Sequence, residues 1–152
     1  MKKETPKKIV KKTTKTTTKQ PIKKTKTVKK AKTIKKAQAP TLPTDTQKLL
    51  RVVTKLLEDN KAQDVLTISL IGKTTLADAL VIASGTSTRH VISTAIKVAE
   101  ELKKKGFKPR LEGRQSSGDW IIIDLNDIIV HIFHPQARAF YDLEKLWSYT
   151  KE

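Results

Sequence analysis

Residues 120–147 constrain the fold of this chain more than any other stretch of its sequence. They begin with two short runs of β-branched and aromatic residues, 121–123 and 128–133, which are too short for a core helix and are typical of strands. Asn126 and Asp127 lie between the runs, tolerate a positive φ and can bond their own backbone. The pattern therefore predicts a hairpin with a two-residue turn.

After Pro135 the hydrophobic period changes from that of a strand to that of a helix. Phe140, Leu143 and Trp147 stand at i, i+3 and i+7, which places them on one helical face. The sequence therefore predicts that one short helix follows the hairpin and closes the domain.

The charge of the chain is concentrated at its beginning. Residues 1–43 carry 16 of the 32 basic residues and one of the 15 acidic residues, so they hold +15 of the net charge of +17. They repeat Lys and Thr without Gly or aromatic residues and have too little apolar surface to offset the entropy of ordering. We predict a disordered tail over 1–43 and one domain over 44–152. A transit peptide is a minor alternative, because the tail lacks Arg and Ser.

The absence of cysteine excludes disulfides, cysteine-ligated zinc and thiol catalysis. No apolar run approaches the roughly 20 residues that span a bilayer, and no signal-peptide apolar region follows the first lysines. We therefore expect a cytoplasmic protein without membrane contact or export. The composition fits a bacterial cytosol and an organelle matrix equally well.

The first half of the domain shows alternating helix and strand patterns. Thr44 and Gln47 have the spacing of a capping box before an apolar stripe that predicts a helix to about residue 60. Residues 65–71 alternate as a half-buried strand does, and 79–83 are continuously apolar, as in a central strand covered on both faces.

A second helix is predicted to begin at the turn 84–87 and to end at Gly106, which can take the left-handed cap. Residues 109–112 then form a short strand, which Pro109 places at a sheet edge. Strand, helix and strand from 79 to 112 indicate a right-handed parallel crossover. The fold class is therefore α/β (α+β), a mixed sheet of about five strands flanked by helices.

Several blocks of the sequence resemble the ribosomal silencing factor family, also called Iojap-like. They are DALVIASGTSTRH at 78–90, Glu112-Gly113 ahead of Trp120, residues 127–133, and FYDLEKLW at 140–147. The resemblance extends from about residue 45 to the end of the chain. Ala79-Leu80 stands where the family has an aromatic pair, and the lysine tail is not part of the family pattern.

The resemblance implies a nucleotidyltransferase-like domain that has no cofactor and is not an enzyme. Family members bind a protein of the large ribosomal subunit, ribosomal protein L14, on the face that meets the small subunit. They block subunit joining and so repress translation. We expect the same of this chain.

The candidate partner-binding residues are Trp120, Ile122 and Asp124, which share one face of their strand, with Glu112 and Arg114 beside them as a polar rim. A tryptophan at a strand start is more often core than interface, and two flanking charges are more often simply solvated. The resemblance favours Trp120 and Ile122 as partner-facing, where a trapped aromatic side chain contributes about 2 kcal/mol or more.

Ser84 and Gly85 at a helix start could hold a phosphate. A nucleotidyltransferase would add two acids one residue apart to hold Mg²⁺, whereas Asp124 and Asp127 lie around the hairpin turn. The favoured interpretation is that the turn only caps its helix.

The remaining family-motif residues have structural interpretations. We expect His90 to bond within its turn and Asp78 to act as a cap. His131 and His134 are three apart on a strand pattern and face opposite sides, so no metal site is expected.

Two alternatives to the translation repressor stay open. One is a nonspecific RNA-binding protein led by the basic tail, whose lysines would contact ribosomal RNA in a salt-dependent way. The other is a divergent nucleotidyltransferase that uses Ser84, Gly85, Asp124 and Asp127. A homodimer formed through an exposed sheet edge is a further possibility.

Overall fold

The structure, a computed structural model, describes residues 41–114 and 117–148. We predicted a disordered tail over residues 1–43. Residues 1–40 of that tail lie outside the described part of the chain. The elements follow in the order α1 (Thr44–Asp59), β1 (Gln63–Ser69), β2 (Ala79–Ser84), α2 (Thr88–Lys104), β3 (Arg110–Glu112), β4 (Trp120–Asp124), β5 (Ile128–Phe133), α3 (Pro135–Tyr141) and α4 (Leu143–Ser148).

The five strands form one mixed sheet in the order β1-β2-β5-β4-β3. β2 and β5 pair in parallel, and the other three pairs are antiparallel. β3 therefore runs in the direction of β2, with β5 and β4 between them, and α2 is the crossover between these two parallel strands. The predicted mixed five-stranded sheet is confirmed, with β3 at an edge.

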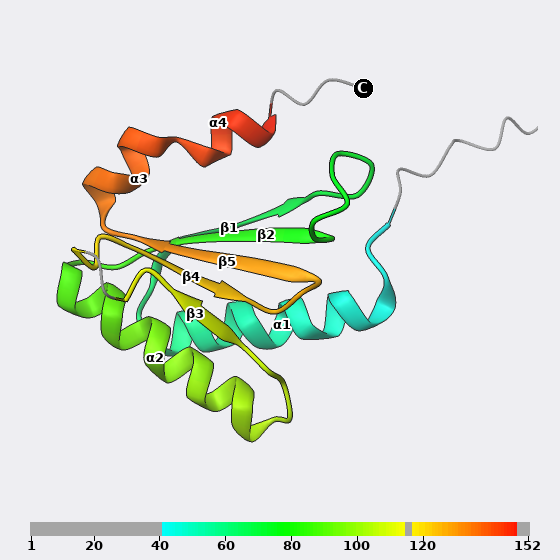
Figure 1. Ribbon diagram of the computed structural model, residues 1–152, viewed down its shortest axis with the longest axis horizontal. Helices are drawn as coiled ribbons and strands as arrows, with labels where there is room; N and C mark the ends of the chain where they lie inside the picture. Colours follow the sequence, from blue (N-terminus) through cyan, green and yellow to red (C-terminus); the bar gives the residue numbers. More distant parts are fainter. Residues whose placement is uncertain (1–40, 115–116, 149–152) are drawn as a thin grey trace, which may run out of the picture. The chain divides into compact units, whose positions relative to one another are not determined.

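One face of the sheet is covered by α1 and α2 (Figure 1). The apolar stripes of both helices pack on alternate residues of β2, β4 and β5, and all of these sheet residues have no exposed surface. We call this the sealed face; its residues in the three strands are Ala79, Val81, Ala83, Ile121, Ile123, Ile128, Val130 and Ile132. It holds the main core of the domain.

The opposite face is covered by α3 and α4, which lie across it in Figure 1. Its residues in the same three strands include Leu80, Ile82, Trp120, Ile122, Ile129, His131 and Phe133. Neither α3 nor α4 contains a fully buried residue. We call this the groove face, because its cover is incomplete.

The predicted C-terminal cap of α2 is confirmed. Gly106 has φ 91°, the Phe107 N–H donates to the Leu102 carbonyl at 3.0 Å, and the Gly106 N–H donates to the Lys103 carbonyl at 3.0 Å. This is a Schellman arrangement, which satisfies two carbonyls that the helix end would leave free.

The predicted capping box of α1 is wrong. The residue before the helix is Pro43, no side chain caps the first turn, and the Gln47 side-chain amide instead donates to the Leu42 carbonyl at 2.7 Å. Pro43 has the extended backbone that the N-cap position requires, so Thr44 already lies inside the helix and its hydroxyl is misplaced for capping.

The predicted single closing helix is also wrong. Asp142 has φ 43° and separates α3 from α4, so residues before and after it do not share one helical face. Leu143 and Trp147 pack on the groove face, whereas the Phe140 side chain is 81% exposed. The break leaves an aromatic side chain free at the surface.

Candidate functional site

The side chains of β4 alternate between the two faces of the sheet. Ile121 and Ile123 are fully buried on the sealed face, whereas Trp120, Ile122 and Asp124 are half-buried on the groove face. The alternation follows from the strand period of two and agrees with the predicted faces. It places Trp120 at the boundary between core and surface.

Trp120 is held from three sides. Its indole Nε1 donates a hydrogen bond to Nδ1 of His131 at 2.9 Å. Its ring lies 5.0 Å from the Phe133 ring and 4.6 Å from the Tyr141 ring, centroid to centroid. Such contacts fix the orientation of an aromatic side chain that still presents an edge to solvent.

A groove of about 770 Å³ lies along Trp120. One wall comes from the ends of β3 and β4 and the loop before β4, and the other from α3 and the residue before it. The lining residues are Thr88, Glu112, Gly113, Ser117, Asp119, Trp120, Ile122, His134, Gln136, Ala137, Phe140 and Tyr141. We call it the Trp120 groove.

The Trp120 groove combines aromatic side chains with two carboxylates. Hydrogen bonds from the hydroxyls of Ser117 and Thr88, the latter at 2.9 Å, lower the pKa of Asp119. Glu112 is exposed on the neighbouring strand, opposite Ile122 in the sheet register. The groove therefore offers flat apolar surfaces beside negative charge.

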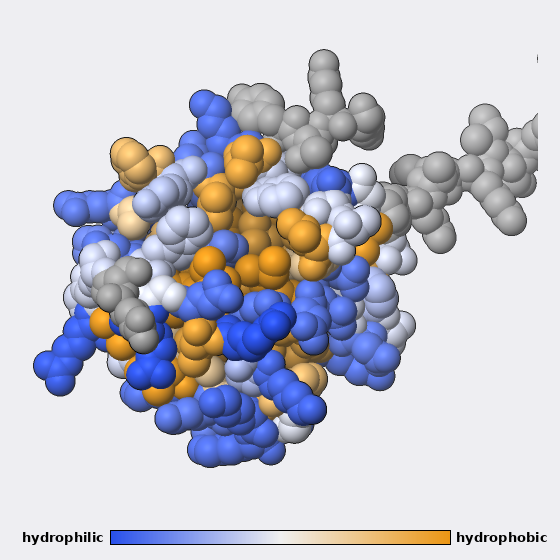
Figure 2. All heavy atoms as spheres, in the orientation of Figure 1, coloured by the Kyte–Doolittle hydropathy of each residue, from blue (hydrophilic) through white to orange (hydrophobic). Residues whose placement is uncertain are grey.

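A second hollow, of about 320 Å³, lies on the other side of Trp120 and Ile122, beneath α4. Its lining is almost wholly apolar and includes Leu80, Ile129, Leu143 and Trp147. Figure 2 shows apolar side chains gathered between the α3–α4 segment and the sheet, bordered by hydrophilic residues. Trp120 and Ile122 line both hollows, so they lie between a mixed polar and aromatic groove and an apolar one.

His131 is a structural partner of Trp120. Burial lowers its pKa to about 4, and Nδ1 accepts the indole hydrogen bond, so the ring is neutral with its proton on Nε2. Within residues 41–114 and 117–148, no group of three or more acidic or histidine side chains is arranged to hold a metal ion.

The structure brings together some of the predicted partner-binding residues and separates others. Trp120, Ile122 and Glu112 line the groove. Arg114 is exposed near its rim and does not line it. Asp124 forms an ion pair with Arg110 of the neighbouring strand β3 at 2.7 Å and accepts the N–H of Asn126 in its own turn at 2.8 Å, so its carboxylate is engaged within the fold.

Two backbone N–H groups of the turn 84–87 are already bonded to other groups of the protein. The Gly85 N–H donates to the Phe133 carbonyl at 2.8 Å, and the Thr86 N–H donates to Nδ1 of His90 at 3.0 Å. Ser87 caps α2 by accepting the His90 N–H. A β-carbon on Gly85 would lie 2.7 Å from a Val91 methyl group and 2.9 Å from its backbone nitrogen, so glycine allows the strand end to meet α2.

His90 and Asp78 link elements of the fold. The second ring nitrogen of His90, Nε2, lies 2.8 Å from the Asn60 carbonyl, which ties the start of α2 to the end of α1. The Asp78 carboxylate accepts the Thr46 hydroxyl at 2.8 Å. Asp78 therefore joins β2 to α1 through a side chain, where a helix cap was expected.

The residues of the nucleotidyltransferase alternative do not converge. Ser84 pairs with Phe133 and Asp124 pairs with Ile129, which are four positions apart on β5. At about 3.3 Å per strand residue, this separation is roughly 13 Å along the strand. The turn and the hairpin carboxylates lie at opposite ends of β5.

Nine of the twelve groove residues were not among the sequence candidates, and Asp119, His134, Phe140 and Tyr141 are the charged and ring-bearing side chains among them. The adjacent aromatic residues at 140 and 141 are visible in the sequence, but the helical pattern placed Phe140 on one face with Leu143 and Trp147. Only the break at Asp142 and the position of α3 reveal that both side chains border the groove.

The fold and the groove define a class of small α/β domain in which two helices seal one face of a five-stranded sheet and the other face presents an aromatic groove. Among the described residues, no helix has both the length and the apolar character that a membrane crossing requires.

A sequence model described as "Ribosomal silencing factor during starvation" matches residues 43–152. A ribosomal silencing factor from Zymomonas mobilis is 42% identical over 109 residues, which cover 71% of this chain and 81% of that protein. The chain belongs to the ribosomal silencing factor family, as the sequence blocks predicted.

Two further relatives extend the comparison. A crystal structure of a protein from Chromobacterium violaceum superimposes with a TM-score of 0.65 at 32% identity, covering 70% of this chain and 89% of that one. A mouse protein named "Mitochondrial assembly of ribosomal large subunit protein 1" is 32% identical over 101 residues, which cover 64% of this chain and 44% of the mouse protein.

Proposed function

We propose that this protein represses translation by binding the large ribosomal subunit through the Trp120 groove, with ribosomal protein L14 as its protein partner. Membership of the ribosomal silencing factor family supports a ribosomal role. The name of the mouse relative, which refers to the large subunit, supports the choice of subunit. The observation that carries the proposal is an aromatic groove on the incompletely covered face of the sheet.

The chemistry of the groove suits a protein partner. Trp120, Phe140 and Tyr141 offer large rigid surfaces, and residues of this type dominate the free energy of protein interfaces when they become fully desolvated. Glu112 and Asp119 place negative charge at one edge, which favours a partner with positively charged side chains and speeds its association.

The proposed mechanism is steric. A domain bound at the intersubunit face occupies space that the small subunit needs, so the two subunits do not join. This effect requires affinity and volume but no bond-making step, so the protein acts without enzymatic turnover. The separation of the turn 84–87 from Asp124 and Asp127 is consistent with this mechanism.

A subunit-joining assay tests the proposal. Full-length protein is incubated with separated large and small subunits, and 70S-type particles are measured by sucrose-gradient sedimentation. The wild-type protein should reduce joining, and Trp120→Ala should need a concentration about 30-fold higher, which corresponds to about 2 kcal/mol. Circular dichroism first establishes that the variant is folded. Equal inhibition by a folded Trp120→Ala protein would refute the docking surface.

The basic tail supports a second, auxiliary contact. Residues 1–43 hold +15 of net charge, and each lysine that neutralises a phosphate releases condensed counterions. We infer that the tail strengthens binding by nonspecific attraction to ribosomal RNA. Deletion of residues 1–43 should weaken large-subunit binding at low salt and have little effect at high salt. Unchanged affinity at low salt would contradict the inference.

A further inference from the structure

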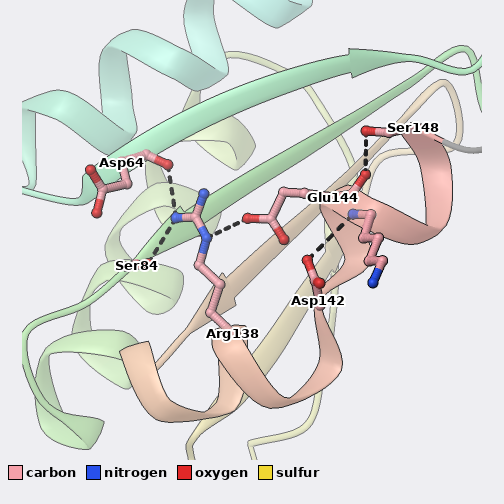
Figure 3. Close-up of polar contacts among 7 residues, drawn as sticks. Asp64, Ser84, Arg138, Asp142, Glu144 and Ser148 are labelled. Carbon is pink, nitrogen blue, oxygen red and sulfur yellow. Dashed lines mark hydrogen bonds and ion pairs between the residues drawn. The ribbon is translucent and has the colours of Figure 1, made fainter.

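One partly buried arginine, Arg138, joins four elements of the fold. The Arg138 side chain extends from α3 toward the first residues of β1, the end of β2 and the start of α4 (Figure 3). Nε donates to a Glu144 carboxylate oxygen at 2.6 Å, and Nη1 donates to the Asp64 carbonyl and the Ser84 hydroxyl, both at 2.8 Å. The arginine and glutamate side chains are 16% and 25% exposed, so water screens this ion pair only partly.

Arg138 does not line the Trp120 groove. The α3 residues that do are Gln136, Ala137, Phe140 and Tyr141. The guanidinium group instead contacts residues of β1 and β2, none of which line the groove. Any influence of Arg138 on a docked partner is therefore transmitted through the position of α3.

The position of α3 and α4 on the sheet depends strongly on the Arg138 contacts, because these helices bury little apolar surface. No residue of α3 or α4 is fully buried; Ala137, Leu143 and Trp147 are partly buried against the core of the groove face, and the exposed Tyr141 contacts the Trp120 ring. The two short helices meet at the left-handed residue Asp142. Besides the Arg138 contacts, the Lys73 ammonium group donates to the Trp147 carbonyl at 2.8 Å.

We propose that Arg138 is a positioning residue for the docking groove. By fixing α3 against β1 and β2, it holds Tyr141 against Trp120 and sets the distance between the two walls of the groove. The inference rests on the proposed function, because the groove matters only if a partner binds there. It assigns control of the groove to a residue that does not touch the partner.

The chemistry requires arginine in particular. Its planar fork presents Nε and Nη1 in fixed directions, so a carboxylate on one element and two oxygen acceptors on two others are bound at once. A lysine has a single nitrogen on a flexible stem and keeps the charge without this geometry. Arg138→Lys therefore separates the loss of geometry from the loss of charge.

The test monitors Trp120 directly. The chain contains two tryptophans, so Trp147→Phe leaves Trp120 as the only one. In full-length Trp147→Phe protein, acrylamide quenching of Trp120 fluorescence and affinity for isolated large subunits are measured for Arg138→Lys and Arg138→Gln. Arg51→Gln is the matched control, because Arg51 is exposed on α1, away from the groove.

Both Arg138 variants should raise the quenching constant of Trp120 about two-fold and weaken large-subunit binding about ten-fold, under conditions where circular dichroism shows them folded. Arg51→Gln should change neither quantity. If Arg138→Gln does not fold, Ser84→Ala removes one hydroxyl acceptor, preserves the ion pair, and should shift both quantities in the same direction by a smaller factor.

The outcomes separate the inference from the proposed function. Unchanged quenching in the folded Arg138 variants would overturn the positioning role, whatever the affinity. Increased quenching with unchanged affinity would show that Arg138 positions the groove but that the groove is not the docking surface, which overturns the functional part of the inference and the proposed site together. The positioning role would also be overturned if the fall in affinity only matched the fraction of the variant protein that is unfolded.

Discussion

The two faces of the sheet are built from alternate residues of the same strands and have different structures. On the sealed face, every sheet side chain of β2, β4 and β5 in the core is buried beneath α1 and α2. On the groove face, α3 and α4 contribute no fully buried residue and leave Trp120, Ile122 and Ile129 half-buried. Stability is therefore concentrated on one face, which leaves the other available for a partner.

The residue types differ in the same way. The sealed face uses aliphatic side chains, which pack without polar atoms. The groove face adds Trp120, His131, Phe133 and Tyr141, whose rings pack against one another, and the polar ring atoms of Trp120 and His131 pair in a hydrogen bond. Aromatic side chains with one polar edge suit a surface that is dry on one side and wet on the other.

The largest expected effect contrasts two neighbours on β4. Ile121 is fully buried on the sealed face, and Ile122 is half-buried on the groove face. Ile121→Ala should lower the free energy of unfolding by about 2–5 kcal/mol, whereas Ile122→Ala should cost about half as much or less, because less surface is lost from the core. Urea denaturation of both variants measures the difference. Equal losses of unfolding free energy in the two variants would show that the two faces contribute equally to stability.

The next effect concerns pH and the groove face. Burial lowers the pKa of His131 from 6.5 to about 4, so the folded protein keeps the ring neutral while the unfolded chain takes up a proton. Stability should therefore fall as pH decreases from about 6.5 to about 4, by about 3 kcal/mol in total at 1.36 kcal/mol per pKa unit.

Denaturation midpoints between pH 7 and pH 4 measure this loss. His131→Gln supplies the control, because other groups titrate in the same range and only the difference in slope belongs to His131. The slope should be shallower in the variant. Identical slopes would mean that the fold does not keep His131 neutral.

A smaller effect is expected where β2 meets α2. A β-carbon on Gly85 would contact both the side chain and the backbone of Val91 at under 3 Å, and the backbone contact leaves little room for adjustment. Gly85→Ala should destabilise the protein by about 1–3 kcal/mol through overpacking. Thermal denaturation checks this value. A neutral result would show that the start of α2 can shift without loss.

The smallest effect is expected at the hairpin. Asp124 pairs with Arg110, whose side chain is 69% exposed, so Asp124→Asn should cost only about 0.2–1 kcal/mol, and salt should reduce the difference. Since Asp124 lies outside the groove, large-subunit affinity should stay at the wild-type value. A clear loss of affinity would show that Asp124 belongs to the partner-binding surface, as the sequence predicted.

Local patterns predicted the elements whose structure is decided locally. The period of two along β4 and β5 gave the strands and their faces, and Asn126 takes the positive φ that the turn requires. Gly106 with Phe107 gave the end of α2. At the start of α1 the capping-box pattern was misleading, because Pro43 takes the N-cap position and Thr44 already lies inside the helix.

The groove could not be predicted, because distant residues decide it. The break at Asp142 occurs without glycine, and the position of α3 depends on contacts of Arg138 with residues 54 and 74 positions earlier. The exposure of Phe140 follows from both. Sequence patterns placed Trp120 and Ile122 on the correct face, but the second wall of the groove exists only in the folded chain.

The most direct test of docking through the Trp120 groove compares two exposed phenylalanines. Phe140 is 81% exposed at the groove, and Phe107 is 36% exposed at the loop after α2. Affinity for isolated large subunits, and for purified ribosomal protein L14, is measured for the full-length wild type, Phe140→Ala and Phe107→Ala. We predict that Phe140→Ala weakens both affinities about ten-fold or more while Phe107→Ala binds as the wild type does. Wild-type affinity in Phe140→Ala, with loss in Phe107→Ala, would place the docking surface elsewhere.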